Sequence, residues 1–294
     1  PLNELFKFTS NMFKNAQGRK LNSLECHDLM CKIADVVVVG GVRRSALISL
    51  SNLSDDRMRH AKSGDWWNTE PQRSFANNSV CYTDGLDTGS FLREWSSLYD
   101  SKSGERGIFN RNAAQAQAAK YGRREADIEY GTNPCSEIIL RPKQFCNLSE
   151  VVVRAEDTLT TLLNKVKLAT ILGTIQSTFT DFKGLGRQWA KNTEEERLLG
   201  VSLTGILDNA MLANKTKDNL PQILSDLREH CVDVNRKFSK QFNIESSAAI
   251  TCVKPSGTVS QLVDAASGIH PRHSEYYIRT VRADKKDPLT LFMT

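Results

Sequence analysis

The residues between Gly131 and Glu150 include the side chains best suited to chemistry. An amide, a thiol and a carboxylate alternate there at Asn133, Cys135 and Glu137. In an extended segment, side chains at i, i+2 and i+4 point to the same side. A thiol is readily converted to a reactive sulfur species, a carboxylate exchanges protons, and an amide donates and accepts hydrogen bonds. The pattern therefore predicts three groups facing one space, suited to a substrate with several hydroxyl groups.

A second thiol, Cys146, follows Cys135 by eleven positions. The apolar residues 138–140 and the polar residues 141–144 predict a strand and a turn, which would return Cys146 toward Cys135. A cysteine taken alone is more often a small buried hydrophobic residue than a reactive one. A reactive role for these two thiols therefore depends on the residues around them.

The sequence around both thiols resembles a known active-site loop. Asn-Pro-Cys-x-Glu followed by Cys-Asn-Leu is similar to the finger loop of ribonucleotide reductases, and Gly-Thr-Asn-Pro-Cys resembles the adenosylcobalamin-dependent (class II) enzymes. The continuation Cys-Asn-Leu-Ser-Glu-Val is more similar to the monomeric triphosphate-reducing branch than to the dimeric one. The resemblance implies that Cys135 becomes a thiyl radical, that Asn133 and Glu137 act on the ribose hydroxyls, and that Cys146 is one of two thiols oxidised in each turnover.

The overall composition is that of an ordinary globular chain, with 39% hydrophobic and 25% charged residues among 294. The net charge of +5 is mild, so anionic small substrates are expected and a nucleic-acid partner is not. The sequence contains no run of eighteen apolar residues, and its first residues lack the pattern of a signal peptide. We therefore expect a cytoplasmic protein without a membrane partner. The seven cysteines are irregularly spaced, which does not indicate a disulfide framework.

Strand and helix patterns alternate along the chain, and this alternation favours an α/β architecture. Helical spacing is found at residues 23–34, after a predicted cap at Asp157, and after residues 218–221, whereas residues 47–50, 75–82, 198–206 and 248–253 read as strands. His27 is interpreted as a surface or helix residue without metal-ligand partners. Cys26 and Cys31 are five positions apart, which predicts packing roles on a helix. Cys231 is predicted to be a core thiol.

A glycine and arginine segment follows the apolar residues 36–39. Its residues are Gly40, Gly41, Val42, Arg43 and Arg44. Glycines allow a sharp turn, and arginines offer planar donors to phosphate or base. Taken alone, the segment also fits a solvated turn. Beside the finger loop, it resembles the reductase specificity loop, which lies between the substrate base and an allosteric deoxynucleotide.

A second small-residue turn is a candidate phosphate site. It consists of Pro255, Ser256, Gly257, Thr258 and Val259, between a strand-like segment and a short helical pattern. Such a junction turns backbone N–H groups toward an anion. The spacing is not that of a Walker A loop, but the turn resembles the one by which class II reductases hold substrate phosphates. His270 and His273 follow as in that family, and they either approach a cofactor or line a loop.

The resemblance also implies a fold and a function. The fold is a ten-stranded α/β barrel with a central finger loop, and residues 1–294 are expected to be part of one such catalytic domain. The family's N-terminal and C-terminal portions, with the other redox thiol and a terminal dithiol, are expected to be missing. No metal-ligand set is predicted.

The implied function is reduction of ribonucleotides to deoxyribonucleotides for DNA synthesis, with triphosphates as the expected substrates. It implies adenosylcobalamin as cofactor, a deoxynucleotide allosteric effector, a thioredoxin-type or dithiol reductant, and the remainder of the reductase chain as a partner. The alternative is a nucleotide-binding fragment without catalysis, or one piece of a split reductase.

Overall fold

The computed structural model describes residues 1–39, 42–43, 45–83, 85, 87–216, 218–278, 280, 285–286 and 288–293. The chain divides into two compact units. The first comprises Pro1–Ala114 and Ile278–Thr294, and the second comprises Gln115–Tyr277.

The first unit contains a three-stranded parallel sheet in the order β3-β4-β5. These strands are β3 (Leu47–Ser51), β4 (Ala76–Tyr82) and β5 (Gly107–Asn110). The central strand β4 is buried along most of its length. The other elements of this unit are α1 (Leu2–Asn15), α2 (Ser23–Asp35), β1 (Val38–Val39), β2 (Val42–Arg43), α3 (Asp56–Arg59), α4 (Trp66–Thr69), η1 (Pro71–Phe75), α5 (Thr88–Ser101) and α11 (Pro288–Met293).

Helix α2 forms where helical spacing predicts it and begins with a capping box between Asn22 and Glu25. His27 lies on this helix as expected, but it is buried rather than at the surface. Its Nε2 lies 3.0 Å from the Asn78 Oδ1. The adjacent Asp28 accepts hydrogen bonds of 2.7 and 2.6 Å from the Arg73 guanidinium. The buried side of α2 is therefore partly polar, and its polar groups are paired.

The second unit is built on two parallel strands, β8 (Asn147–Val152) and β9 (Leu199–Thr204), paired from Asn147↔Leu199 to Val152↔Thr204. Thr251 adds a parallel bridge to Val201 on the far side of β9. The strand predicted at residues 248–253 is therefore present in part. Besides this bridge, three backbone hydrogen bonds of 2.8 to 3.0 Å join residues 249, 250 and 252 to β9. Three parallel segments thus form the floor of this unit.

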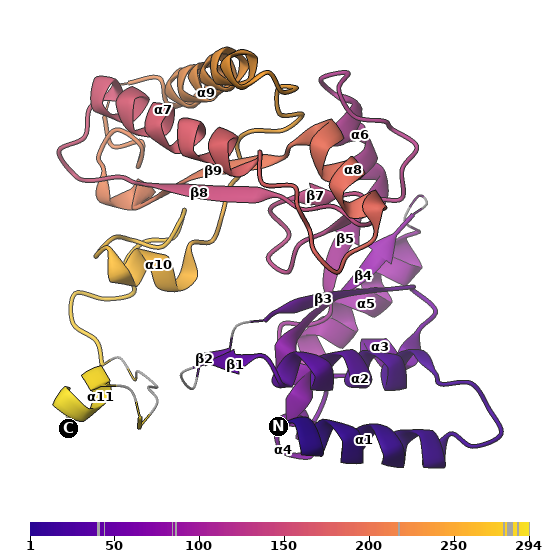
Figure 1. The fold of residues 1–294 in the computed structure, drawn as a ribbon. Helices are drawn as coiled ribbons and strands as arrows, with labels where there is room; N and C mark the ends of the chain where they lie inside the picture. Colours follow the sequence, from indigo (N-terminus) through magenta and orange to yellow (C-terminus); the bar gives the residue numbers. More distant parts are fainter. Residues whose placement is uncertain are drawn as a thin grey trace. The chain divides into compact units, whose positions relative to one another are not determined.

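Two long helices, α7 (Leu159–Gln176) and α9 (Leu220–Phe242), lie side by side on one face of this floor (Figure 1). Residues on alternate strand positions point to opposite faces, so Val151, Val201 and Leu203 pack with the helices. Cys231 of α9 belongs to the same core, as the sequence predicts. The opposite face carries Leu148, Glu150, Gly200 and Ser202. The unit also contains β6 (Gly131–Thr132), β7 (Ile139–Leu140), α8 (Arg187–Glu196), η2 (Ile206–Asp208) and α10 (Gly257–Leu262), and α6 (Arg111–Ala119) enters it.

The cap predicted for α7 is wrong by one residue. Thr158 is the N-cap, in a capping box with Thr161. Asp157 instead holds the preceding turn, because its carboxylate accepts a hydrogen bond of 2.7 Å from the Arg154 N–H and a bond of 2.6 Å from the Lys165 Nζ. The start of α9 is as predicted, with Pro221 in the first turn, and Asn219 is its N-cap.

The mixed α/β class is confirmed. The described strands form sheets of two and three strands, so the ten-stranded barrel stays a prediction. In the described part of the chain, no helix has both the length and the apolar character that a membrane span requires.

Candidate functional site

The hairpin of β6 and β7 carries the first candidate residues. Its strands pair antiparallel through Gly131↔Leu140 and Thr132↔Ile139. The intervening segment is a tight turn, in which the Ser136 N–H donates a hydrogen bond of 2.9 Å to the Asn133 carbonyl and Ser136 has a φ of 64°. The prediction of an extended segment is therefore wrong at this point. The chain has to reverse direction between two paired strands, and strand alternation does not hold through such a reversal.

The Asn133 side chain supports the shape of this turn. Its Oδ1 accepts a hydrogen bond of 3.0 Å from the Ile138 backbone N–H. Asn residues commonly stabilise turns by bonding to nearby backbone groups. One end of the amide is therefore committed to the loop itself.

Cys135 and Glu137 are exposed to different degrees at this turn. Cys135 is exposed, whereas Glu137 is half-buried and its Oε2 is a buried oxygen without a hydrogen-bond partner among the described residues. A buried polar atom without a partner is costly and needs a physical explanation. A ligand hydroxyl or proton donor at this position would satisfy the Glu137 oxygen.

Cys146 lies close enough to Glu137 to be influenced by its charge. Burial raises the pKa of the Cys146 thiol to about 11, and the negative charge of Glu137 adds to this effect. The structure thus brings Cys146 to the Glu137 side of the hairpin. At neutral pH, the group at this position is the protonated thiol.

A third thiol, Cys252, belongs to the same group and was missed as a site residue. Burial raises the pKa of Cys252 to about 12, and the charges of Glu137 and Cys146 act in the same direction. The sequence had placed Cys252 only within a strand. Its position just before the Pro-Ser-Gly-Thr turn is the one sequence signal that would have pointed to it.

Gly200 of β9 lets the hairpin lie against the sheet. A Cβ at this position would stand 2.4 Å from the Leu148 Cδ2, 3.0 Å from the Cys252 Sγ and 3.1 Å from the Ile138 Cδ1. Real side chains do not approach a Cβ as closely as 2.4 Å. Because Gly200 has no side chain, Ile138 of the hairpin, Leu148 of β8 and Cys252 can all pack against it.

The turn predicted to bind phosphate lies at the start of α10. Ser256 is buried and has a φ of 64°, and its hydroxyl donates a short hydrogen bond to the Glu150 carboxylate. The Lys254 Nζ lies 4.0 Å from the other oxygen of Glu150. Glu150 points from the same sheet face as Gly200, and sequence reasoning did not single it out. The phosphate role of residues 255–259 stays a prediction.

The specificity-loop residues are described only in part. Gly40, Gly41 and Arg44 lie outside the described residues. Val42 and Arg43 form strand β2, in which Arg43 pairs with Val38 and Val42 pairs with Val39 of β1. His270 and His273 are exposed in the chain that follows α10, and both readings of their role stay open. No cluster of three or more His, Cys, Asp or Glu side chains in the described ranges is arranged to hold a metal ion.

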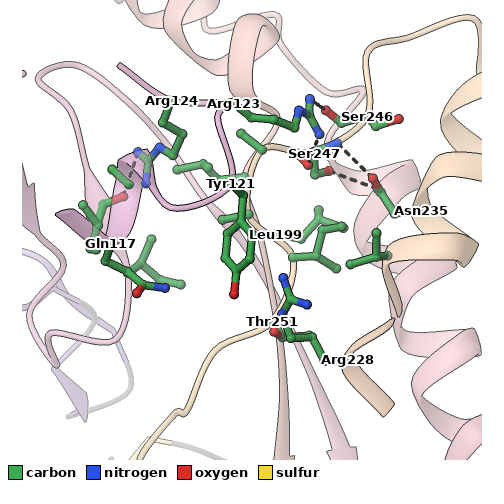
Figure 2. A pocket seen from close by; sticks show the side chains of 18 of the residues that line it. Gln117, Tyr121, Arg123, Arg124, Leu199, Arg228, Asn235, Ser246, Ser247 and Thr251 are labelled. Carbon is green, nitrogen blue, oxygen red and sulfur yellow. Dashed lines mark hydrogen bonds between the residues drawn. The ribbon is translucent and has the colours of Figure 1, made fainter. Parts of the chain in front are cut away.

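A cavity of about 740 Å³ lies beside the base of the hairpin, within the second unit. Of the predicted catalytic residues, Glu137 lines it. Figure 2 shows Tyr121 and Arg228 among its walls, with the guanidinium carbon of Arg228 4.5 Å from the centre of the tyrosine ring. On another side, Arg123 donates to the carbonyls of residues 246 and 247. The volume is in the range of small-molecule sites, and the lining combines apolar side chains with four arginines.

Comparison with known proteins confirms the family resemblance. No protein-family model matches the chain. The chain is 29% identical over 319 aligned residues to the adenosylcobalamin-dependent ribonucleoside-triphosphate reductase of Lacticaseibacillus paracasei, and this match covers 98% of the chain and 41% of that enzyme. It is 27% identical over 327 residues to the enzyme of the same name from Lactobacillus leichmannii, with coverage of 98% and 42%. The chain thus spans about two fifths of the length of these curated relatives.

Two solved structures share its fold. A B12-dependent (class II) ribonucleotide reductase has a TM-score of 0.66 and 23% identity, over 90% of this chain and 39% of the other. The alpha subunit of the Actinobacillus ureae class Id ribonucleotide reductase has a TM-score of 0.64 and 15% identity, over 95% of this chain and 62% of the other. The described chain therefore shares its fold with part of each of these two proteins.

Proposed function

We propose that this chain is part of the catalytic domain of an adenosylcobalamin-dependent ribonucleoside-triphosphate reductase, which reduces ribonucleotides to 2′-deoxyribonucleotides. The similarity to such enzymes over 98% of the chain is the observation that carries the proposal. The hairpin supports it, because an exposed thiol and a carboxylate oxygen without a partner lie within three residues of each other at its turn. Residues 1–294 are proposed to be part of one ten-stranded barrel domain.

The position of Cys135 fits an adenosylcobalamin-dependent reaction. Its thiol is exposed at the turn of the hairpin, where a bulky cofactor can approach without displacing core residues. When bound, adenosylcobalamin supplies homolysis of its cobalt–carbon bond as the source of the radical. Within this chain, Cys135 is the residue that loses its hydrogen atom and then removes hydrogen from the ribose 3′ carbon.

Glu137 and Asn133 are proposed to act on the ribose hydroxyls. The Glu137 oxygen that has no partner takes the proton of the 3′ hydroxyl, while the 2′ hydroxyl gains a proton from a thiol of the redox pair and leaves as water. Because the Asn133 Oδ1 is held by the Ile138 N–H, contact with a hydroxyl falls to the amide nitrogen of Asn133. The hairpin turn thus separates the structural and the substrate-facing ends of one side chain.

Cys146 is proposed to supply one of the two sulfur atoms that are oxidised to a disulfide as the nucleotide is reduced. Its raised pKa keeps it as the thiol at neutral pH, which is the form that donates hydrogen. The second thiol of the pair is proposed to lie in the remainder of the reductase. A thioredoxin-type or dithiol reductant restores the pair by thiol–disulfide exchange.

Substrate phosphates are proposed to bind at Pro255, Ser256, Gly257, Thr258 and Val259. The resemblance of the turn to the class II phosphate turn supports this, together with the nearby Lys254. Residues Gly40 to Arg44 are proposed to connect a deoxynucleotide effector to the substrate base. A nucleotide-binding piece without catalysis is the second candidate.

The test is Cys135→Ser in the full-length protein that carries this chain, with Cys26→Ser as the matched control. Both thiols are exposed, but Cys26 lies on α2 of the first unit. We expect Cys135→Ser to reduce nucleotide reduction to background while nucleotide binding persists, and Cys26→Ser to retain activity. Substantial reduction by Cys135→Ser would disprove the assignment. Nucleotide binding without reduction or cobalt–carbon cleavage in the wild type would favour the second candidate.

A further inference from the structure

A buried polar network joins helix α8 to two segments of the candidate site. One is the hairpin strand after Glu137, which we call the Glu137 arm, and the other is the turn before Cys146, which we call the Cys146 arm. We call the network the α8 clamp and define it by Arg124, Gln144, Asn192 and Glu196. Gln144, Asn192 and Glu196 are each at most 7% exposed. None of the clamp residues belongs to the predicted site. All of their contacts lie within the second unit.

Gln144 is the centre of the clamp. Its Oε1 accepts a hydrogen bond of 3.1 Å from the Arg141 backbone N–H, which closes the turn before Cys146. Its Nε2 donates bonds of 2.6 Å to the Glu196 Oε2 and 3.3 Å to the Asn192 carbonyl. Both ends of one amide are therefore used, and Gln144 holds the chain two residues before Cys146.

Arg124 holds the other arm. It donates hydrogen bonds of 3.0 Å to the Ile139 carbonyl and 3.1 Å to the Glu196 Oε2. The Ile139 carbonyl lies two residues after Glu137 on the same hairpin. Glu196 thus accepts hydrogen bonds from Gln144, which fixes the Cys146 arm, and from Arg124, which fixes the Glu137 arm.

Asn192 completes the connection to α8. Its amide nitrogen donates a hydrogen bond of 2.8 Å to the Pro142 carbonyl, in the turn between the two arms. Charge-assisted bonds in a buried setting are strong and directional. A buried network that links several segments of the chain fixes geometry more tightly than apolar packing does.

We infer that Gln144 and Glu196 are positioning residues that set the separation between the Cys146 thiol and the Glu137 carboxylate. The inference rests on the proposed function only for its consequence in catalysis. A site that passes protons and hydrogen atoms between these groups requires their geometry to be held within a fraction of an ångström. The clamp residues hold this geometry through their contacts with the two arms, without contacting substrate.

The experiment uses Gln144→Glu, Glu196→Gln and the double variant that combines them. Gln144→Glu leaves two carboxylates at this contact, and Glu196→Gln leaves two amides. The double change restores one amide and one carboxylate. Glu195→Gln is the matched control, because it makes the same chemical change on the adjacent, exposed residue, which binds the Arg141 side chain. Circular dichroism and thermal unfolding confirm folding. If a single variant does not fold, Gln144→Met replaces it.

The readout is the pH profile of Cys146 alkylation, followed by mass spectrometry of the peptide that contains it. Glu137 is the charged group that influences this thiol. In the single variants we expect the midpoint to fall from about 11 toward the ordinary thiol value of 9, so alkylation at pH 9 rises several-fold. The double variant and Glu195→Gln should keep the wild-type profile. In the full-length reductase, kcat should fall in the single variants with KM unchanged.

Two outcomes would overturn the inference. One is an unchanged Cys146 profile in folded single variants. The other is a double variant that folds but keeps the profile of the single variants. The alkylation measurement needs no reductase activity, so it stands if the proposed function fails. Loss of the proposed function would instead appear as wild-type protein that shows the alkylation profile but reduces no nucleotide.

Discussion

The coupling between Glu137 and Cys146 is a property of two single residues. Both belong to the second unit, and the Glu137 Oε2 has no hydrogen-bond partner among the described residues. Burial disfavours the thiolate, and a nearby negative charge disfavours it further. The same two effects act on Cys252. Cys146 and Cys252 are therefore kept protonated, which suits hydrogen donation and opposes nucleophilic attack.

The first prediction is that Glu137→Gln lowers the pKa of Cys146. Burial, the larger cause, is retained, so the pKa should fall below about 11 while staying above the ordinary thiol value of 9. Because the thiolate is the form that is alkylated, the reaction with iodoacetamide at pH 9 should become faster. Asp226→Asn on the surface of α9 is the control and should change nothing. An unchanged rate in Glu137→Gln would show that the carboxylate does not face Cys146.

The second prediction concerns His27. Burial is the largest influence and lowers its pKa, but hydrogen bonds with Asp28 and Cys31 outweigh it and raise the pKa to about 9. A pKa raised above the ordinary value of 6.5 means that the folded state favours the protonated ring. This contribution is complete below pH 6.5 and is lost as pH rises through 9. At about 1.4 kcal/mol per pKa unit, it amounts to at most about 3 kcal/mol.

Thermal unfolding between pH 6 and pH 9.5 measures this effect. The wild type should lose stability over this interval, and His27→Gln should be less stable at pH 6 but less dependent on pH. His60→Gln is the control, because His60 is exposed on the same unit. Parallel pH curves for the wild type and His27→Gln would contradict the prediction.

At the level of elements, the hairpin and the sheet meet over Gly200. The third prediction is that Gly200→Ala displaces the hairpin, because the new Cβ would lie 2.4 Å from Leu148 and 3.1 Å from Ile138. Overpacking of this kind costs about 1–3 kcal/mol. Hydrogen–deuterium exchange should increase at the Ile138 amide, which bonds to Asn133.

Gly173→Ala is the matched control for Gly200→Ala. Its Cβ would face the opposite side of the sheet and meet the flexible end of Leu199 at 3.4 Å. Alanine also has a higher helix propensity than glycine in α7. Stability should therefore be unchanged or slightly higher, with normal exchange in the hairpin. Equal exchange in both variants would mean that Gly200 does not position the hairpin.

Elements with local signals were predictable from sequence, and contacts between distant elements were not. Helix α2, strand β9 and the start of α9 follow from spacing, caps and a proline in the first turn. The turn at residues 133–138 depends on pairing between β6 and β7, which the local alternation does not reveal. His27 and Cys252 are buried by segments far along the chain. The α8 clamp joins residues up to 72 positions apart, and no motif marks it.

At the level of the whole molecule, the chain carries its proposed regulatory and catalytic residues in different units. Val42 and Arg43 belong to the first unit, and the hairpin belongs to the second. Effector binding and chemistry are then separable properties, and coupling between them is a free energy shared by two sites. A variant in one unit should change the coupling without removing the chemistry of the other.

The last prediction is that Arg43→Ala alters substrate choice but not the chemical step. In the full-length protein that carries this chain, reduction of each ribonucleotide would be assayed with and without each deoxynucleotide effector. We expect the effector dependence to flatten across the four substrates, because a planar donor between effector and base is lost. Lys7→Ala on α1 is the control, as it removes a charge from the same unit outside the loop. Equal loss of activity toward all four substrates would place Arg43 in the chemistry, and unchanged effector dependence would remove its role in specificity.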